Sequence, residues 1–113
     1  MVKLHQIEEI DAFIHTHEFV FVYISQPNCS VCHSVLPKLK ELLKSYPDIV
    51  LGEVDGAEVP QVTAAYQVFS APTLLLFING KEYIREGRFV QFQKLTFDLD
   101  RFYAFEKELT EQL

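Results

Sequence analysis

Two cysteines separated by two residues are the side chains best suited to chemistry in this sequence. Cys29 and Cys32 are its only cysteines, and they follow closely on the apolar run Phe19–Ile24. We expect a helix to begin at Cys29, and helical residues three apart have Cβ atoms about 5–6 Å from each other, within reach of a disulfide after small adjustments. The spacing alone also fits two buried core cysteines. The position between a strand and a helix favours a redox-active dithiol.

The expected positions of the two thiols predict different roles. At a helix start, Cys29 faces unsatisfied N–H groups and the positive end of the helix dipole, which favour the thiolate and should bring its pKa into the range of roughly 3.5–7.5. Cys32 lies one turn further on, shielded, and should ionise less until a mixed disulfide forms beside it. We therefore predict that Cys29 attacks a substrate disulfide and that Cys32 resolves the intermediate.

Hydrophobic patterning predicts the elements that position these thiols. In chain order we expect a helix at 6–17, a strand at 19–24, a helix at 29–46 with Asn28 as N-cap, a strand at 49–54, a short helix with Val59, Val62 and Tyr66 on its inner face, strands at 73–78 and 83–86 joined by Asn79-Gly80, and a helix at 91–110; residues 2–4 could add a leading strand. Helices that alternate with buried strands predict an α/β fold with a central mixed sheet of four to five strands and helices on both faces. The first two long strands should be parallel neighbours.

Composition limits the classes of function. The 113 residues are the size of a single domain, 1–113, and carry a net charge of −6 without a basic stripe, so we expect neither nucleic acid nor membrane as a partner. The N-terminus lacks the apolar run of a signal peptide, and the longest apolar runs are of strand length. We therefore expect a cytoplasmic protein, where a cysteine pair is more often redox-active or metal-binding than a structural crosslink.

The chain resembles the thioredoxin family along almost its whole length. The similarity rests on the apolar strand before the Cys-X-X-Cys, on Pro37 five residues after the second cysteine, on Val54-Asp55, on the segment from Tyr66 to Thr73, on Asn79-Gly80 and on Gly87. The resemblance implies a thioredoxin fold and thiol–disulfide oxidoreductase activity. It also implies a cis Pro72 packed against the active-site disulfide, although the residues alone also fit a turn proline that starts a strand.

The same resemblance indicates where a substrate would bind. The backbone of Ala71, before Pro72, should pair with an extended substrate peptide. Pro27 and Asn28 stand just before the first cysteine, where thioredoxins usually have Trp, and are further expected substrate contacts. The expected partners are disulfide-containing proteins or small thiols, together with a reductase or thiol electron donor, and the protein should act as a monomer or weak dimer.

The chain departs from the family at two linked positions. Tyr23 stands where the family has a buried acid that handles the proton of the resolving cysteine, and Leu51 stands where the family has its lysine partner. A phenol has an ordinary pKa of about 10, so near neutrality it cannot serve as the base. Tyr23 could donate a hydrogen bond to a sulfur or a water and so orient Cys32 without deprotonating it.

The cysteine motif also fits other kinds of site. With His33 it matches the Cys-X-X-Cys-His of covalent haem attachment, but the only Met is Met1 and the chain is rich in strands, so we expect no cofactor and no metal. His33 would raise the local positive potential when protonated, or be a solvated histidine without a role. A metal held between two chains, a non-catalytic adaptor that binds peptides beside Pro72, and a redox sensor remain as alternatives.

The last helix carries more aromatic residues than one core face uses. Phe92, Phe97 and Phe105 lie off the stripe formed by Leu95, Leu99 and Phe102. We expect wide burial of this helix against the sheet, with a partner or dimer surface as the alternative.

Overall fold

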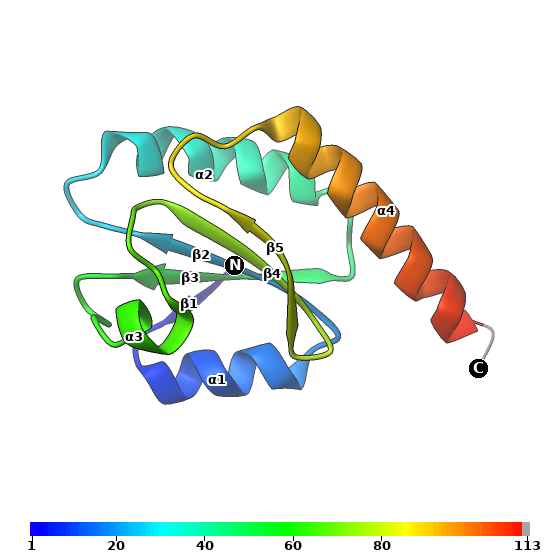
Figure 1. Cartoon of the computed structure of the whole chain (residues 1–113), viewed down its shortest axis with the longest axis horizontal. Helices are drawn as coiled ribbons and strands as arrows, with labels where there is room; N and C mark the ends of the chain where they lie inside the picture. The colour runs from blue at the N-terminus through cyan, green and yellow to red at the C-terminus, as the bar shows by residue number, and fades with distance from the viewer. Residues whose placement is uncertain (112–113) are drawn as a thin grey trace.

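Five strands form one mixed sheet in the order β1–β3–β2–β4–β5 (Figure 1). The computed structural model describes the backbone of residues 1–111 and the side chains of residues 1–108. In chain order the elements are β1 (Val2–Leu4), α1 (Ile7–Thr16), β2 (Phe19–Ser25), α2 (Ser30–Leu43), β3 (Ile49–Asp55), α3 (Val62–Tyr66), β4 (Thr73–Ile78), β5 (Lys81–Glu86) and α4 (Phe92–Glu111). As predicted, β2 and β3 are parallel neighbours, and residues 2–4 add a strand beside β3. The predicted α/β architecture is confirmed.

Helices cover both faces of the sheet, as predicted, with α2 and α4 on one face and α1 and α3 on the other (Figure 1). The central strand β2 is buried on both faces, which explains its unbroken apolar sequence. Phe19, Phe21 and Tyr23 alternate onto the face covered by α2 and α4, as the period of a strand requires. Val20 and Val22 pack on the opposite face.

The boundaries of α2 differ from the prediction at both ends. Asn28 is not its N-cap: Cys29 takes that position, with an extended backbone (φ −114°, ψ 102°) and its own sulfur as the capping acceptor. The helix ends at Leu43 instead of Tyr46. Tyr46 precedes Pro47, and the residue before a proline is disfavoured in helical conformation.

Two other elements also differ in extent. Val59 is buried with Val62 but lies before the short helix, since α3 covers only Val62–Tyr66. Strand β5 begins at Lys81, two residues before the expected start. Both residues of the β4–β5 turn have positive φ, 51° for Asn79 and 82° for Gly80, which is the backbone that this dipeptide favours.

The expectation of wide burial for α4 is wrong for two of its aromatic residues. Phe97 is 66% exposed and Phe105 59% exposed, whereas Phe92 packs partly against the core. Leu95 and Leu99 are the fully buried residues of this helix as far as residue 108. Phe97 lies two positions from each of them, about 200° around the helix, and therefore faces away from the sheet.

Candidate active site

The two cysteines form a disulfide where β2 leads into α2. Their Sγ atoms are 2.29 Å apart and their Cα atoms 5.3 Å apart. The prediction that the two sulfurs lie close enough to bond is confirmed. Both residues are buried, Cys29 at 7% exposure and Cys32 at 2%, so the first cysteine is the more accessible one.

The surroundings of Cys29 favour negative charge on its sulfur. The backbone N–H of Cys32 donates a hydrogen bond to Cys29 Sγ, with 3.1 Å between nitrogen and sulfur. The first turn of α2 contains no acidic residue, so nothing within that turn offsets the positive end of the helix dipole. In the reduced protein the same N–H group and dipole would stabilise a Cys29 thiolate.

The segment between α3 and β4, residues 67–72 (the Pro72 loop), lies against the disulfide. The Ala71–Pro72 peptide bond is cis, as predicted. Cys29 Sγ lies 3.8 Å from the carbonyl oxygen of Ala71. Pro72 is buried, whereas Ala71 is partly exposed. The residue beside the sulfur is therefore partly accessible to solvent.

Hydrogen bonds from neighbouring elements hold this loop in place. The guanidinium of Arg85, on β5, donates to the carbonyl oxygens of Tyr66 (2.7 Å) and Gln67 (3.0 Å). The hydroxyl of Thr73 donates to the carbonyl oxygen of Ser70 at 2.7 Å. Both ends of the segment that leads to Ala71 are thus tied to the sheet, which keeps its backbone in position beside the cysteines.

Tyr23 lies against Cys32, but its contact differs from the expected one. Its hydroxyl donates a 2.6 Å hydrogen bond to the backbone carbonyl oxygen of Cys32, rather than to a sulfur. The side chain is fully buried. Burial, and secondarily the negative charge of Glu53, raises the pKa of Tyr23 to about 12. Leu51, in the family's lysine position, is buried in the same cluster of side chains.

The remaining predicted residues surround the disulfide on the exposed side. Pro27, Asn28 and His33 are all solvent-exposed. Pro27 and His33 line one cavity of about 280 Å³, together with Glu53 and residues of β1, β3 and the segments that follow them. Across this cavity, His5 Nδ1 lies 2.8 Å from Glu58 Oε1. The structure thus brings His33 and Pro27 together, and Asn28 stays outside that cavity.

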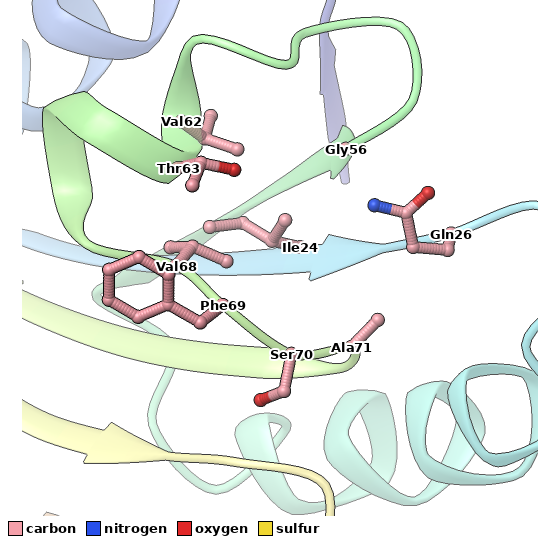
Figure 2. A pocket seen from close by; sticks show the side chains of 9 residues that line it. All are labelled: Ile24, Gln26, Gly56, Val62, Thr63, Val68, Phe69, Ser70 and Ala71. Carbon is pink, nitrogen blue, oxygen red and sulfur yellow. The ribbon is translucent and has the colours of Figure 1, made fainter.

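A second cavity, of about 310 Å³, lies between α3 and the Pro72 loop (Figure 2). Val62 and Thr63 of α3 line it together with Phe69 and Ala71. Phe69 is 81% exposed. Sequence reasoning assigned no role to Phe69. The available signal was a large aromatic residue within a Ser- and Pro-containing segment, where no helical or strand pattern would bury it.

In residues 1–108, no group of three or more His, Cys, Asp or Glu side chains is arranged to hold a metal ion. Across the part of the chain that the structure describes, no helix combines the length and apolar character needed to cross a bilayer.

The fold and the cysteine pair together define a class, the thioredoxin-like thiol–disulfide oxidoreductases. The chain belongs to the thioredoxin family, because the family model described as Thioredoxin matches residues 1–96.

Individual relatives agree with this assignment. The thioredoxin-like protein YdfQ of Bacillus subtilis (strain 168) is 47% identical over 103 residues, which cover 91% of this chain and 92% of that protein. The thioredoxin of Chlamydia pneumoniae is 33% identical over 85 residues, which cover 75% of this chain and 82% of that protein.

Solved structures agree on the fold. A thioredoxin of Plasmodium falciparum matches 77% of this chain and 85% of its own length, with a TM-score of 0.71 and 28% identity. A thioredoxin of Fasciola hepatica matches 89% of this chain and 98% of its own length with a TM-score of 0.77; at 24% identity this likeness concerns the fold alone.

Proposed function

We propose that this protein reduces disulfides of proteins or of small thiols in the cytoplasm, as a monomer or weak dimer, through a Cys29/Cys32 dithiol. The observation that carries the proposal is the position of Cys29 at the N-cap of α2. There its sulfur accepts the Cys32 N–H and lies 3.8 Å from the carbonyl oxygen of Ala71. A nucleophile, its resolving partner and a backbone segment for the substrate thus meet at one point.

The reaction proceeds in two exchanges. The Cys29 thiolate attacks one sulfur of the substrate disulfide; that S–S bond breaks, the other sulfur leaves as a thiolate and takes up a proton, and a mixed disulfide remains on Cys29. Cys32 then loses its proton and its thiolate attacks Cys29 Sγ. This forms the intramolecular disulfide and releases the second substrate thiol. Two electrons from an external dithiol or a reductase return Cys29 and Cys32 to the thiol state.

The substrate is held by backbone pairing rather than by a deep pocket. Ala71 is partly exposed, and its backbone would pair with an extended peptide, which would add as a short strand beside the loop. Pro72 would lie under that peptide, and Pro27 and Asn28, which are exposed just before Cys29, would contact it as well. Because these groups contact mainly the backbone of the substrate, they are compatible with more than one substrate sequence.

Tyr23 positions the resolving cysteine and does not take its proton. With a pKa of about 12, the phenol stays protonated throughout the neutral range, and its hydrogen bond goes to the Cys32 carbonyl oxygen. The proton of Cys32 therefore passes to hydroxide or a solvent base, so the resolving rate should climb with pH through neutrality.

Reduction of insulin disulfides with dithiothreitol as electron donor tests the proposal. We expect insulin to precipitate faster with the protein than with dithiothreitol alone, and Cys29→Ser to abolish that difference. Cys32→Ser should instead accumulate a mixed disulfide on Cys29, detectable by mass spectrometry. If the protein adds nothing to the rate of dithiothreitol, the oxidoreductase proposal fails, and a peptide-binding adaptor or a redox sensor takes its place.

A further inference from the structure

A third cavity lies on the β5 side of the Pro72 loop. It has a volume of about 200 Å³, and we call it the Glu86 pocket after the residue that gives it charge. Phe69, Ser70 and Thr73 line it from the loop and β4, and Arg85, Glu86 and Gly87 line it from the end of β5. The loop that presents Ala71 to the substrate is therefore also one wall of this pocket.

Glu86 carries an unsatisfied hydrogen-bond acceptor. Its Oε1 atom is buried and has no hydrogen-bond partner among the described residues. A buried acceptor without a donor costs free energy, and carboxylate oxygens form their strongest hydrogen bonds with positively charged donors. Lys and Arg are donor-only side chains of that charge. Glu86 itself lines the pocket, so a rotation of its carboxylate group would bring Oε1 to a cationic group held there.

Among the described residues, Arg85 is the one cation that lines this pocket, and it already has partners. The guanidinium of Arg85 forms an ion pair with Glu82, at 2.8 Å, and donates to the carbonyl oxygens of Tyr66 and Gln67. Its charge is balanced by Glu82. The carboxylate of Glu86 therefore remains the unbalanced charge of the pocket wall.

Phe69 adds a second feature that favours a cation. Phe69 lines both the Glu86 pocket and the cavity between α3 and the Pro72 loop. In Figure 2 the hydroxyl of the next residue, Ser70, points away from α3. The face of an exposed aromatic ring attracts ammonium and guanidinium groups, and the ring also packs against the aliphatic part of Lys or Arg. A carboxylate at the end of β5 and a phenyl ring in the segment before β4 line one pocket, and together they suit a long basic side chain.

We propose that the Glu86 pocket binds a Lys or Arg side chain of the disulfide substrate, so that substrates with a basic residue close to the target cysteine are preferred. The inference rests on the proposed function, since the substrate peptide must pair with Ala71. Ser70 adjoins Ala71, whose carbonyl oxygen is 3.8 Å from Cys29 Sγ. An extended peptide advances about 3.3 Å per residue, so residues next to its cysteine pass over the loop. The net charge of −6 also favours basic substrates, but without directing them to one position.

The test uses short peptides whose single cysteine is joined to thionitrobenzoate. Thionitrobenzoate is the better leaving group, so Cys29 forms a bond to the peptide sulfur and releases a coloured thiolate. Lys is placed at each flanking position in turn and compared with norleucine, a neutral side chain of similar shape. Each rate is divided by the rate of the same peptide with dithiothreitol, which removes any intrinsic effect of Lys. We expect the Lys peptide to react about tenfold faster at one position.

Two matched variants distinguish binding in the Glu86 pocket from general electrostatic attraction to the negatively charged protein. Glu86→Gln removes the charge and should reduce the Lys-to-norleucine ratio several-fold. Glu41→Gln removes an equal charge from the far end of α2 and should leave the ratio at its wild-type value. Thermal unfolding checks that both variants fold.

The outcomes distinguish the two proposals. Equal rates for Lys and norleucine at every position in the wild type overturn the pocket assignment while the oxidoreductase proposal stands. A ratio that falls equally in both variants assigns the preference to net charge and also overturns the pocket. If no peptide reacts faster with the protein than with a matched concentration of dithiothreitol, both proposals fail.

Discussion

The hydroxyl of Tyr23 donates a 2.6 Å hydrogen bond to the backbone carbonyl oxygen of Cys32. The bond joins the buried central strand to the first turn of α2, on the inner side of the cysteine pair. By the resemblance to the family, Tyr23 corresponds to its buried acid and Leu51 to its lysine. The chain thus has a link between this strand and Cys32, but the link is a neutral hydrogen bond to the backbone.

Removal of that hydroxyl should affect stability more than chemistry. Tyr23→Phe deletes the donor to Cys32 and keeps the ring, so we expect the free energy of unfolding to fall by about 1 kcal/mol. Because the phenol does not carry the proton, decay of the mixed disulfide should change only modestly. Urea unfolding and stopped-flow kinetics measure the two quantities. A large loss of the resolving rate would mean that the phenol takes part in the chemistry.

The same residue predicts a loss of stability at alkaline pH. The pKa of Tyr23 is raised to about 12 in the folded protein, against about 10 in an unfolded chain. The folded state therefore binds the proton more tightly, and this contribution to stability is complete below pH 10 and is lost as the pH rises toward 12. Tyr46 and Tyr66 also have raised pKa values, so the wild type is compared with Tyr23→Phe. The variant should lose less stability over this interval; identical slopes would contradict the assignment.

An acid at position 23 should raise the rate of the resolving step and lower the stability of the fold. Tyr23→Asp places a carboxylate near Cys32, which should speed the resolving step at neutral pH. A lone buried charge is costly, so we expect destabilisation of roughly 3–5 kcal/mol. Adding Leu51→Lys should recover part of this loss, since both positions belong to one buried cluster. A double-mutant cycle by urea unfolding measures the coupling, and strict additivity would show that the two side chains do not interact.

The two thiols should differ in reactivity. In the reduced protein we expect Cys29 to be alkylated first, with a pKa between roughly 3.5 and 7.5. The reason is that Cys29 caps α2 and its sulfur accepts a hydrogen bond from the Cys32 N–H. Iodoacetamide labelling against pH, followed by peptide mapping, gives the order and the pKa. The Cys32→Ser variant should show the same titration, since Cys29 keeps its cap. Faster labelling of Cys32 in the wild type would invert the assigned roles.

Local features of the sequence determined most of the fold. The apolar run of β2, the amphipathic spacing of α1 and the Asn79-Gly80 turn each depend on residues close together in the chain, so pattern alone located them. The Cys-X-X-Cys spacing likewise depends on a single helical turn. The family resemblance, rather than the pattern, predicted that Pro72 would lie beside the disulfide.

Only the tertiary structure decided the contacts between residues distant in the chain. No pattern indicates that the hydroxyl of Tyr23 reaches the carbonyl of Cys32 rather than a sulfur, or that one oxygen of Glu86 is buried without a donor. The same holds for Phe69 and Phe97, which remain exposed although their side chains are apolar. Apolar character sets how strongly a side chain favours burial, but the packing of the other elements determines whether a partner surface lies next to it.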